Sequence, residues 1–339
     1  TGANEAVELR DCDPERYDGK GVQKAIENIH KVILPEVIGI TASDQFKIDR
    51  ILIDLDGTKN KRNLGANAIL GVSMSNAKAA AASLGVPLYK YLNPETNHHI
   101  LPVPMLNIIN GGKHADNSTD IQEFMIVPAK FSSFQEAMRG ASEVYHTLRR
   151  YLARNGHYTT IGDEGGFAPN LSSNEEALEV ILEGIHNAKY KAGQDIFIAL
   201  DIAASELYKD DKYQMKTEGK SLSSKDMVNY LRGFVEKYPI ISIEDGLSED
   251  DWEGWTLMVQ RLGDRIQIVG DDLFVTNPKR IQRGIDEGAA NSVLVKVNQI
   301  GTLTEALQAV KLTRAVGWNA VIRHRSGETE DVPIADLAV

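Results

Sequence analysis

Five short, mostly hydrophobic runs recur through the second half of the chain, and each is followed by a charged residue. They occupy residues 196–200, 240–243, 266–270, 292–295 and 320–322. A nearly continuous run of β-branched and aliphatic residues is typical of a parallel strand that is buried on both faces. The charged residues that follow the runs, called the charged stops below, lie roughly 25 to 45 residues apart. A βαβ crossover takes about 30 residues or more. The pattern therefore predicts successive βα units.

The segments between these runs have the periodicity of amphipathic helices. Ser223 or Ser224 can cap a helix whose apolar residues recur at three- and four-residue steps. Those residues are Met227, Tyr230, Leu231, Phe234 and Val235. Pro278 lies near the start of a second helix, where its missing N–H costs least, and residues 303–312 form a third. A repeat of strand, charge and helix predicts an α/β barrel of the (β/α)8 type.

The first part of the chain has a different composition and a different hydrophobic pattern. Residues 21–37 and 67–84 are helical stretches rich in Ala, Ile and Val, without the strand-then-charge repeat. The chain becomes polar over residues 92–99 and then reaches two prolines, which is typical of a boundary. The sequence therefore predicts a smaller N-terminal domain over residues 1–95 and a barrel domain over residues 96–339. The barrel domain opens with two strands, over residues 101–110 and 121–128.

Three of the charged stops are carboxylates: Asp201, Glu244 and Asp271. A barrel gathers the C-terminal ends of its strands at one face, where its chemistry takes place. A single acid at a strand end is more often a helix cap or a surface charge. Three acids on successive strands repel one another unless a cation lies among them, and oxygen ligands suit Mg²⁺. The order of the stops therefore predicts a divalent cation site.

The other two stops are basic. Lys296, directed into a barrel mouth beside a divalent ion, has its neutral form favoured and can act as a general base. The alternative is that it only neutralises one of the acids. His324, Arg325 and Ser326 follow the last run and are candidate contacts for an anion, because a guanidinium matches phosphate. A lone histidine is usually structural, but the Arg-Ser-Gly context favours a functional one.

Three further candidates lie in loops or inside a strand. Glu164 is surrounded by glycines in Gly-Asp-Glu-Gly-Gly, where a tight turn and close approach of a ligand are possible. Such a carboxyl could donate a proton, although an ordinary polar loop is the alternative. Glu123, preceded by Gln122 and set among apolar residues, is either directed outward or functional. His114, in a Gly-Gly-Lys-His loop, is a candidate anion contact.

Composition narrows the function classes. The net charge of −11 makes nucleic acid an improbable partner, because phosphates require a basic surface. The acidity otherwise indicates solubility. Cys12 is the single cysteine, so no intrachain disulfide can form and a reducing compartment is indicated. No run is long enough to span a bilayer and no signal-peptide pattern is present, so we expect a cytoplasmic protein.

Taken together, nine motifs resemble the enolase family, the phosphopyruvate hydratases of glycolysis. They occur in the family's order over nearly the whole chain, and their residues are more similar to those of bacterial enolases than to those of animal ones. The motifs are residues 2–6, 64–72, 110–115, 122–126, 162–166, 242–245, 271–277, 296–302 and 324–331.

The resemblance implies an enolase-type (β/α)8 barrel, incomplete in this sequence, preceded by a smaller α+β N-terminal capping domain. It implies dehydration of 2-phosphoglycerate to phosphoenolpyruvate with Mg²⁺ held by Asp201, Glu244 and Asp271. Lys296 would remove the proton at carbon 2, following the superfamily's pairing of a Lys or His base with Mg²⁺. Glu164 would donate a proton to the departing hydroxyl with help from Glu123.

The remaining implied roles concern the substrate. Gln122 and His114 would line it together with Glu123 and Lys296, while His324, Arg325 and Ser326 would bind its phosphate. The partner is thus a small phosphorylated molecule, and family members are usually homodimers or larger homo-oligomers. The resemblance also allows pools at the cell surface or outside the cell.

The sequence departs from the family pattern at three places. It begins at Thr1, where the family has a preceding Ser-Gly-Ala-Ser loop that helps hold a second Mg²⁺. It ends at Val339, before the strand that supplies a second active-site lysine. Arg323 stands where the family usually has serine and could crowd the phosphate pocket or point outward. We expect the whole protein to have the missing residues, since a barrel without its last strand leaves an open edge.

Two other readings compete with this one. A racemase or dehydratase of the wider superfamily would share the metal triad, but not the His-Arg-Ser-Gly motif or the Gly-Asp-Glu-Gly-Gly loop. An inactive scaffold or binding protein that kept the fold is favoured only by the missing ends and by Arg323. A chain that truly lacked both ends would be expected to have little or no turnover.

Overall fold

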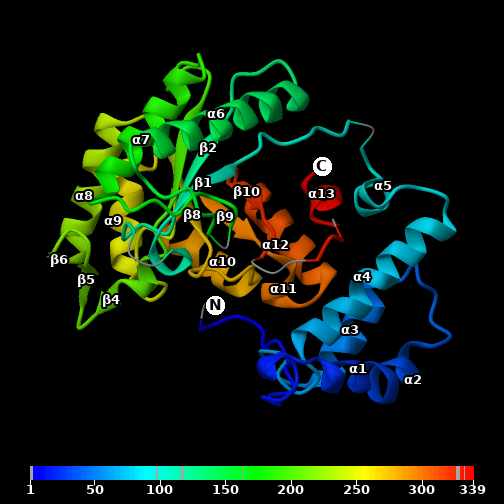
Figure 1. Ribbon diagram of the computed structural model, residues 1–339. Helices are drawn as coiled ribbons and strands as arrows, with labels where there is room; N and C mark the ends of the chain where they lie inside the picture. The colour runs from blue at the N-terminus through cyan, green and yellow to red at the C-terminus, as the bar shows by residue number, and fades with distance from the viewer. Residues whose placement is uncertain (1–2, 97, 116–117, 163, 326–328, 332) are drawn as a thin grey trace. The chain divides into compact units, whose positions relative to one another are not determined.

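The computed structural model describes residues 3–96, 98–115, 118–162, 164–325, 329–331 and 333–339. The chain forms two compact units (Figure 1). Unit 1 comprises Thr1–Ile100, Phe274–Arg283 and Val293–Val339, and unit 2 comprises Leu101–Leu273 and Gly284–Ser292. The first break lies near the predicted boundary at residues 95–96, but unit 1 also contains later segments. The predicted boundary therefore stays a prediction.

The sheet of unit 2 carries three of the five predicted strands. Its strands are β1 (Leu106–Asn110), β2 (Glu123–Val127), β3 (Phe197–Asp201), β7 (Ile240–Glu244) and β8 (Gln267–Gly270), in the order β1-β2-β3-β7-β8. β2 pairs antiparallel with both β1 and β3, whereas β3, β7 and β8 are parallel. The predicted α/β architecture with parallel strands is thus confirmed.

Long helices flank this sheet. They are α6 (Phe134–Arg154), α7 (Asn174–Asn187), α8 (Ser224–Lys237) and α9 (Trp252–Leu262). Figure 1 shows α6 beside α7 and α8 beside α9, and both pairs are in contact. A small sheet projects from the β3–α8 connection as β4 (Tyr208–Lys209), β5 (Lys212–Met215) and β6 (Lys220–Leu222). Two 3-10 turns complete the unit, η3 (Gly112–His114) and η4 (Ala204–Glu206).

Helix α8 illustrates how the sequence specifies these elements. Ser223 caps it by accepting a hydrogen bond from the N–H of Asp226, which satisfies one of the amide groups that a helix start leaves unpaired. Met227, Leu231, Phe234 and Val235 of the predicted stripe are buried, together with Val228. Tyr230, also in that stripe, instead donates its hydroxyl to Glu218 at 2.8 Å.

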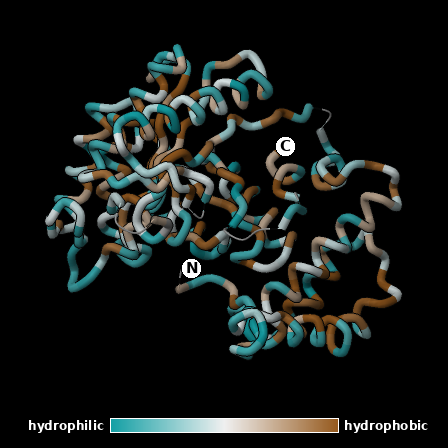
Figure 2. Tube along the Cα trace, in the orientation of Figure 1, coloured by the Kyte–Doolittle hydropathy of each residue, from teal (hydrophilic) through white to brown (hydrophobic). Residues whose placement is uncertain are grey.

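Unit 1 contains most of the remaining helices. Its first segment has η1 (Tyr17–Gly19), α1 (Gln23–Asn28), η2 (Ile29–Ile33), α2 (Leu34–Val37), α3 (Gln45–Asp56), α4 (Ala66–Ser83) and α5 (Leu88–Leu92). Across the described residues 3–96, the regular elements are all helical. Figure 2 shows hydrophobic residues along α1, η2 and α2. Ile33, Ile48, Leu52 and Ile69 form the buried core of this segment.

The later segments of unit 1 hold the last two predicted strands, β9 (Ser292–Val295) and β10 (Asn319–Ile322). The other elements there are α10 (Pro278–Glu287), which begins in unit 1, α11 (Val297–Ile300), α12 (Leu303–Ala315) and α13 (Pro333–Ala338). Pro278 is the first residue of its helix, as predicted. The buried Lys61 amine forms an ion pair with Glu305 of α12 at 3.0 Å, which joins the first segment of unit 1 to the later one.

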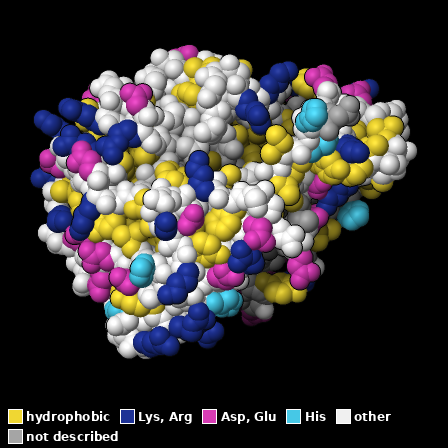
Figure 3. All heavy atoms as spheres, turned by 90° about the horizontal axis from the view of Figure 1, so that it is seen from above, with side chains coloured by type: hydrophobic (Ala, Val, Ile, Leu, Met, Phe, Trp, Pro, Cys, Tyr) yellow, Lys and Arg dark blue, Asp and Glu magenta, His cyan; other side chains and the backbone are white. Residues whose placement is uncertain are grey.

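The surface carries charges of both signs. On the face shown in Figure 3, Lys and Arg side chains alternate with Asp and Glu side chains, with hydrophobic groups between them. Within the described ranges, none of the helices is both long and apolar enough to cross a membrane.

Candidate active site and metal centre

Three neighbouring parallel strands of unit 2 end on buried carboxylates. Asp201 is the last residue of β3, and its Cα lies opposite that of Glu244, the last residue of β7. Glu244 in turn lies opposite Val269 of β8, two residues before Asp271. The exposed fractions of Asp201, Glu244 and Asp271 are only 4%, 3% and 7%. The structure thus brings the predicted triad to one edge of the sheet, with its charges removed from water.

Asp245 organises this edge. Its two carboxylate oxygens accept hydrogen bonds from the backbone N–H groups of Asp271, at 3.0 Å, and Asp272, at 2.8 Å. Its own N–H donates to the carbonyl of Val269 at 3.0 Å. Its φ of 43° lies in the left-handed region, which costs about 1–3 kcal/mol for a residue other than glycine and persists only where the surroundings enforce it. Asp245 therefore fixes the backbone just after β8, and with it the position of Asp271.

Repulsion among these acids is evident at Asp245. Burial raises the pKa of its carboxyl well above the ordinary value, and the charges of Asp272, Asp271, Asp201 and Glu244 raise it further. Since crowding several carboxylates away from water is costly, bound protons or a cation would stabilise the cluster.

The donor atoms fit a divalent ion. Ligand atoms of Asp245, Asp271 and Asp272 all lie within 4.8 Å of one another, and carboxylate oxygens are the ligands that Mg²⁺ and Ca²⁺ prefer. This group shares only Asp271 with the predicted triad. Sequence reasoning missed Asp245 and Asp272, although each directly follows an acid that it had selected.

Gln122 and Glu123 lie against the same carboxylate edge. The Gln122 side-chain amide donates to Asp201 at 3.3 Å, and the other Asp201 oxygen accepts the N–H of Ala203 at 3.0 Å. Glu123 begins β2, is buried, and its Cα lies opposite that of Asp201. The structure therefore brings these two predicted residues next to Asp201 of the predicted metal triad.

The loop that carries Glu164 is fastened to strand β1. Phe167 donates its N–H to the carbonyl of Ile108 at 2.9 Å and accepts from the N–H of Asn110 at 2.8 Å. A side chain at Gly166 would meet the Asn110 side-chain oxygen at 2.6 Å, so glycine is required for this close approach. The Tyr145 hydroxyl donates to the carbonyl of Gly165 at 2.9 Å. The half-buried Glu164 is thus held near the sheet, and Asp163 lies outside the described residues.

The Gly-Gly loop before His114 is equally constrained. A side chain at Gly111 would meet the Thr119 hydroxyl at 2.0 Å and the Ile121 carbonyl at 2.4 Å. Glycine at this position therefore lets the loop pass close to the segment just before Gln122. His114 ends the turn η3, and its side chain is outside the described part of the structure.

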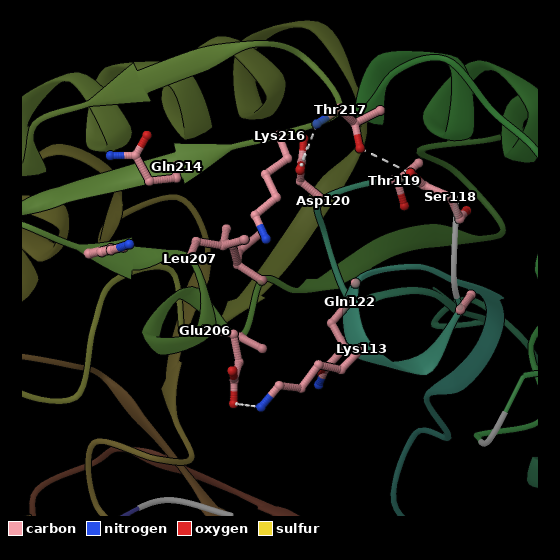
Figure 4. A pocket seen from close by; sticks show the side chains of 15 residues that line it. Lys113, Ser118, Thr119, Asp120, Gln122, Glu206, Leu207, Gln214, Lys216 and Thr217 are labelled. Atoms are coloured by element: carbon pink, nitrogen blue, oxygen red, sulfur yellow. Dashed lines mark hydrogen bonds and ion pairs between the residues drawn. The ribbon is translucent and has the colours of Figure 1, made fainter.

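A pocket of about 670 Å³ lies beside Gln122 (Figure 4). Lys113 and Glu206 form an ion pair at one side of it. On the other side, Asp120 accepts the N–H of Thr217 at 3.0 Å, and the amine of Lys216 points into the cavity. The pocket therefore offers charges of both signs next to the carboxylate edge.

The two predicted basic residues come from neighbouring strands of unit 1. Lys296 directly follows β9, is half-buried, and donates its backbone N–H to the hydroxyl of Thr276 at 2.9 Å. β10 is held beside it, because the N–H of Arg323 donates to the carbonyl of Val295 at 3.1 Å. Arg325 forms an ion pair with the buried Glu5 at 2.5 Å.

The remaining predicted phosphate contacts are His324 and Ser326, and the structure describes only His324. His324 is exposed, and its Nδ1 lies 3.0 Å from the carbonyl oxygen of Arg325. Ser326 lies outside the described residues.

Two family models match the chain. Residues 1–92 match "Enolase, N-terminal domain", and residues 98–339 match "Enolase, C-terminal TIM barrel domain". Together they cover nearly the whole sequence. The predicted resemblance and the predicted barrel class are both confirmed by these matches.

Proposed function

Since the chain belongs to the enolase family of lyases, we propose that it converts 2-phosphoglycerate to phosphoenolpyruvate and water. The observation that carries this proposal is the row of buried carboxylates at the ends of β3, β7 and β8, crowded around Asp245. A proton next to a carboxylate is very weakly acidic, so its removal needs positive charge where negative charge develops. A site of crowded acids that a cation would stabilise meets this need.

Asp201, Glu244 and Asp271 are the residues that would hold Mg²⁺. Enolase-family proteins typically use a divalent metal, and carboxylate oxygens are hard ligands that suit Mg²⁺. Asp271 belongs both to this triad and to the close group of Asp245, Asp271 and Asp272. We assign Asp245 to a supporting role, because both of its oxygens already accept backbone N–H groups. When bound, the ion would offset the negative charge that builds up on the substrate carboxylate.

Lys296 is the proposed base. Its neutral amine would accept the carbon-2 proton, and the electron pair of the broken C–H bond would remain on the substrate. The Thr276 hydroxyl fixes the backbone of this lysine, and a fixed base keeps its nitrogen within reach of the proton.

Glu164 is the proposed acid for the second half of the reaction. It would give a proton to the hydroxyl on carbon 3, which then leaves as water while the double bond forms. Its attachment to β1 through Phe167 and Gly166 supports this role, since a catalytic acid must be held in place. The buried Glu123 would assist it.

The other candidates would bind substrate. Arg325 is suited to the phosphate through its planar fork of N–H donors, and His324 and Ser326 would complete that contact. Gln122, tied to Asp201, and His114 would line the rest of the molecule. We further propose that the protein acts in the cytoplasm as a homodimer or larger homo-oligomer, which sedimentation of the purified protein would test.

The activity is tested with the full-length protein, 2-phosphoglycerate and Mg²⁺. Ultraviolet absorbance of the enol product should rise, and it should stop rising when EDTA is added. Sugar acids that lack phosphate serve as the matched substrates for the competing superfamily reactions. Turnover of these acids without turnover of 2-phosphoglycerate would contradict the proposal, and no turnover of either would favour the scaffold.

A further inference from the structure

A continuous series of polar contacts links Arg325 to Lys296 within unit 1. The Arg325 guanidinium pairs with one oxygen of Glu5 at 2.5 Å, and the Gln299 amide donates to the other at 3.4 Å. The Gln299 oxygen accepts from the Thr276 hydroxyl at 2.9 Å, and the Thr276 oxygen accepts the N–H of Lys296 at 2.9 Å. Residues from three separate segments of the sequence thus form one network.

The middle of this network is removed from water. The exposed fractions of Glu5, Gln299 and Thr276 are 7%, 1% and 0%. A buried amide, hydroxyl or carboxylate costs free energy unless it is paired, and more so if it is charged. Each of these side chains forms a hydrogen bond with the next residue of the network. These bonds favour a single arrangement of the side chains.

The backbone around the network is also unusually constrained. Val275 and Thr276 have φ values of 44° and 55°, a left-handed geometry that is strained for β-branched residues. This geometry accompanies the two hydrogen bonds of the Thr276 hydroxyl. Next to Glu5, Ala6 donates its N–H to the carbonyl of Gln299 at 2.8 Å. The carboxylate is therefore fixed to α11, the short helix that begins directly after Lys296.

We propose that Glu5 is a positioning residue for Arg325, and that Thr276, joined to Glu5 through Gln299, is a positioning residue for Lys296. This inference rests on the proposed function, in which Arg325 binds phosphate and Lys296 removes a proton. A guanidinium is a rigid planar fork of five N–H donors, so a fixed carboxylate at one of its nitrogens sets the plane of the whole group. Glu5 would thereby orient the side chain that recognises the substrate.

The first test replaces Glu5 by Gln, which keeps the length of the side chain and removes its charge. We expect the KM for 2-phosphoglycerate and the inhibition constant of inorganic phosphate both to rise roughly tenfold, the scale of a lost charged hydrogen bond. The kcat should change by less than about threefold, because the Thr276 hydroxyl still holds Lys296. Glu5→Asp, which keeps the charge, should recover part of the phosphate affinity.

The matched control is Glu8→Gln, which removes the exposed partner of Arg10 from the same segment and should leave both constants unchanged. An active wild type whose Glu5→Gln variant keeps the wild-type KM and phosphate inhibition would overturn the inference. An equal loss in Glu5→Gln and Glu5→Asp, accompanied by a collapsed melting temperature, would also overturn it. Failure of the proposed function is distinguishable, because the wild type itself would then be inactive and insensitive to phosphate.

A second variant tests the other end of the network without touching Glu5. Thr276→Val keeps the shape of the side chain and removes the hydroxyl that holds Lys296. We expect kcat to fall roughly tenfold while KM stays nearly constant, since one buried N–H loses its partner. Thr276→Ser, which restores the hydroxyl, should recover kcat, and an unchanged kcat in Thr276→Val would overturn this part of the inference.

Discussion

The strand ends of the two units carry opposite charges and balance them in different ways. In unit 2, β3, β7 and β8 end on acids that repel one another around Asp245. In unit 1, the Arg325 that follows β10 has the buried Glu5 as a counter-charge from its own chain. The acidic ends therefore place like charges side by side, whereas the basic end places opposite charges side by side. Crowded acids, as in unit 2, would suit the binding of a cation. A guanidinium held by a buried carboxylate, as in unit 1, would suit an anion contact whose orientation is set in advance.

The largest expected effect concerns the base. Replacing Lys296 by Ala should lower kcat about 10²- to 10⁴-fold, because a positioned acid or base contributes that much to a reaction. Mg²⁺ affinity, measured by calorimetric titration, should change little, since the proposed ligands of the ion are the acids Asp201, Glu244 and Asp271. A joint loss of turnover and Mg²⁺ binding would mean that the role of Lys296 is structural.

A smaller effect should appear when one acid is removed. Glu244→Gln should weaken Mg²⁺ binding about tenfold or more, since a carboxylate ligand is lost. Without any divalent ion, however, this variant should resist urea better than the wild type, because one repelling charge is gone. Addition of Mg²⁺ should reverse the order, as a ligand stabilises the state that binds it.

The exposed Asp250 provides the control for this experiment. Asp250→Asn should keep both the Mg²⁺ affinity and the metal-free stability of the wild type. A metal-free Glu244→Gln protein that is less stable than the wild type would show that the acids are not mutually repulsive.

The smallest effect concerns an acid in unit 2 that does have partners. Burial by itself raises the pKa of Glu218, but hydrogen bonds from Lys220, Tyr230 and Asn174 outweigh this and lower it. A lowered pKa in the folded state gives stability that is present above the ordinary value of 4.5 and is lost as the pH falls through the folded value. Glu218→Gln should therefore lower the free energy of unfolding by about 1 kcal/mol at pH 7.

Urea unfolding at several pH values measures this difference. The gap between the wild type and Glu218→Gln should close as the pH drops below 4.5. Glu236→Gln, which removes an exposed acid of α8, should show no such pH dependence. A gap that widens in acid would contradict the assigned direction of the shift.

Much of the fold could be predicted because it follows from local patterns. Buried parallel strands show up as hydrophobic runs, so β3, β7, β8, β9 and β10 were all expected from the sequence. The Ser223 cap and the proline that opens α10 depend only on neighbouring residues. The charged stops were found in the same way, because each comes directly after its run.

Other features depend on contacts between distant residues, and the sequence could not reveal them. Asp245 was quoted within a motif, but its support of the β8 loop depends on its left-handed backbone. Glu5 contacts Gln299 and Arg325, from the other end of the chain. Tyr230 was expected in an apolar stripe, yet its hydroxyl is used by Glu218. The catalytic and binding roles themselves stay predictions, and the experiments above are their test.

The double acceptance by Asp245 has a consequence for which side chains this position tolerates. Asparagine has the same size, but only one end of its amide can accept a hydrogen. It would direct its NH₂ group against the N–H of either Asp271 or Asp272. A shorter serine would have a single oxygen for the same two donors. The carboxylate at this position thus fixes the backbone of Asp271 and Asp272 in advance, so that ion binding at the proposed site would need little rearrangement of the chain.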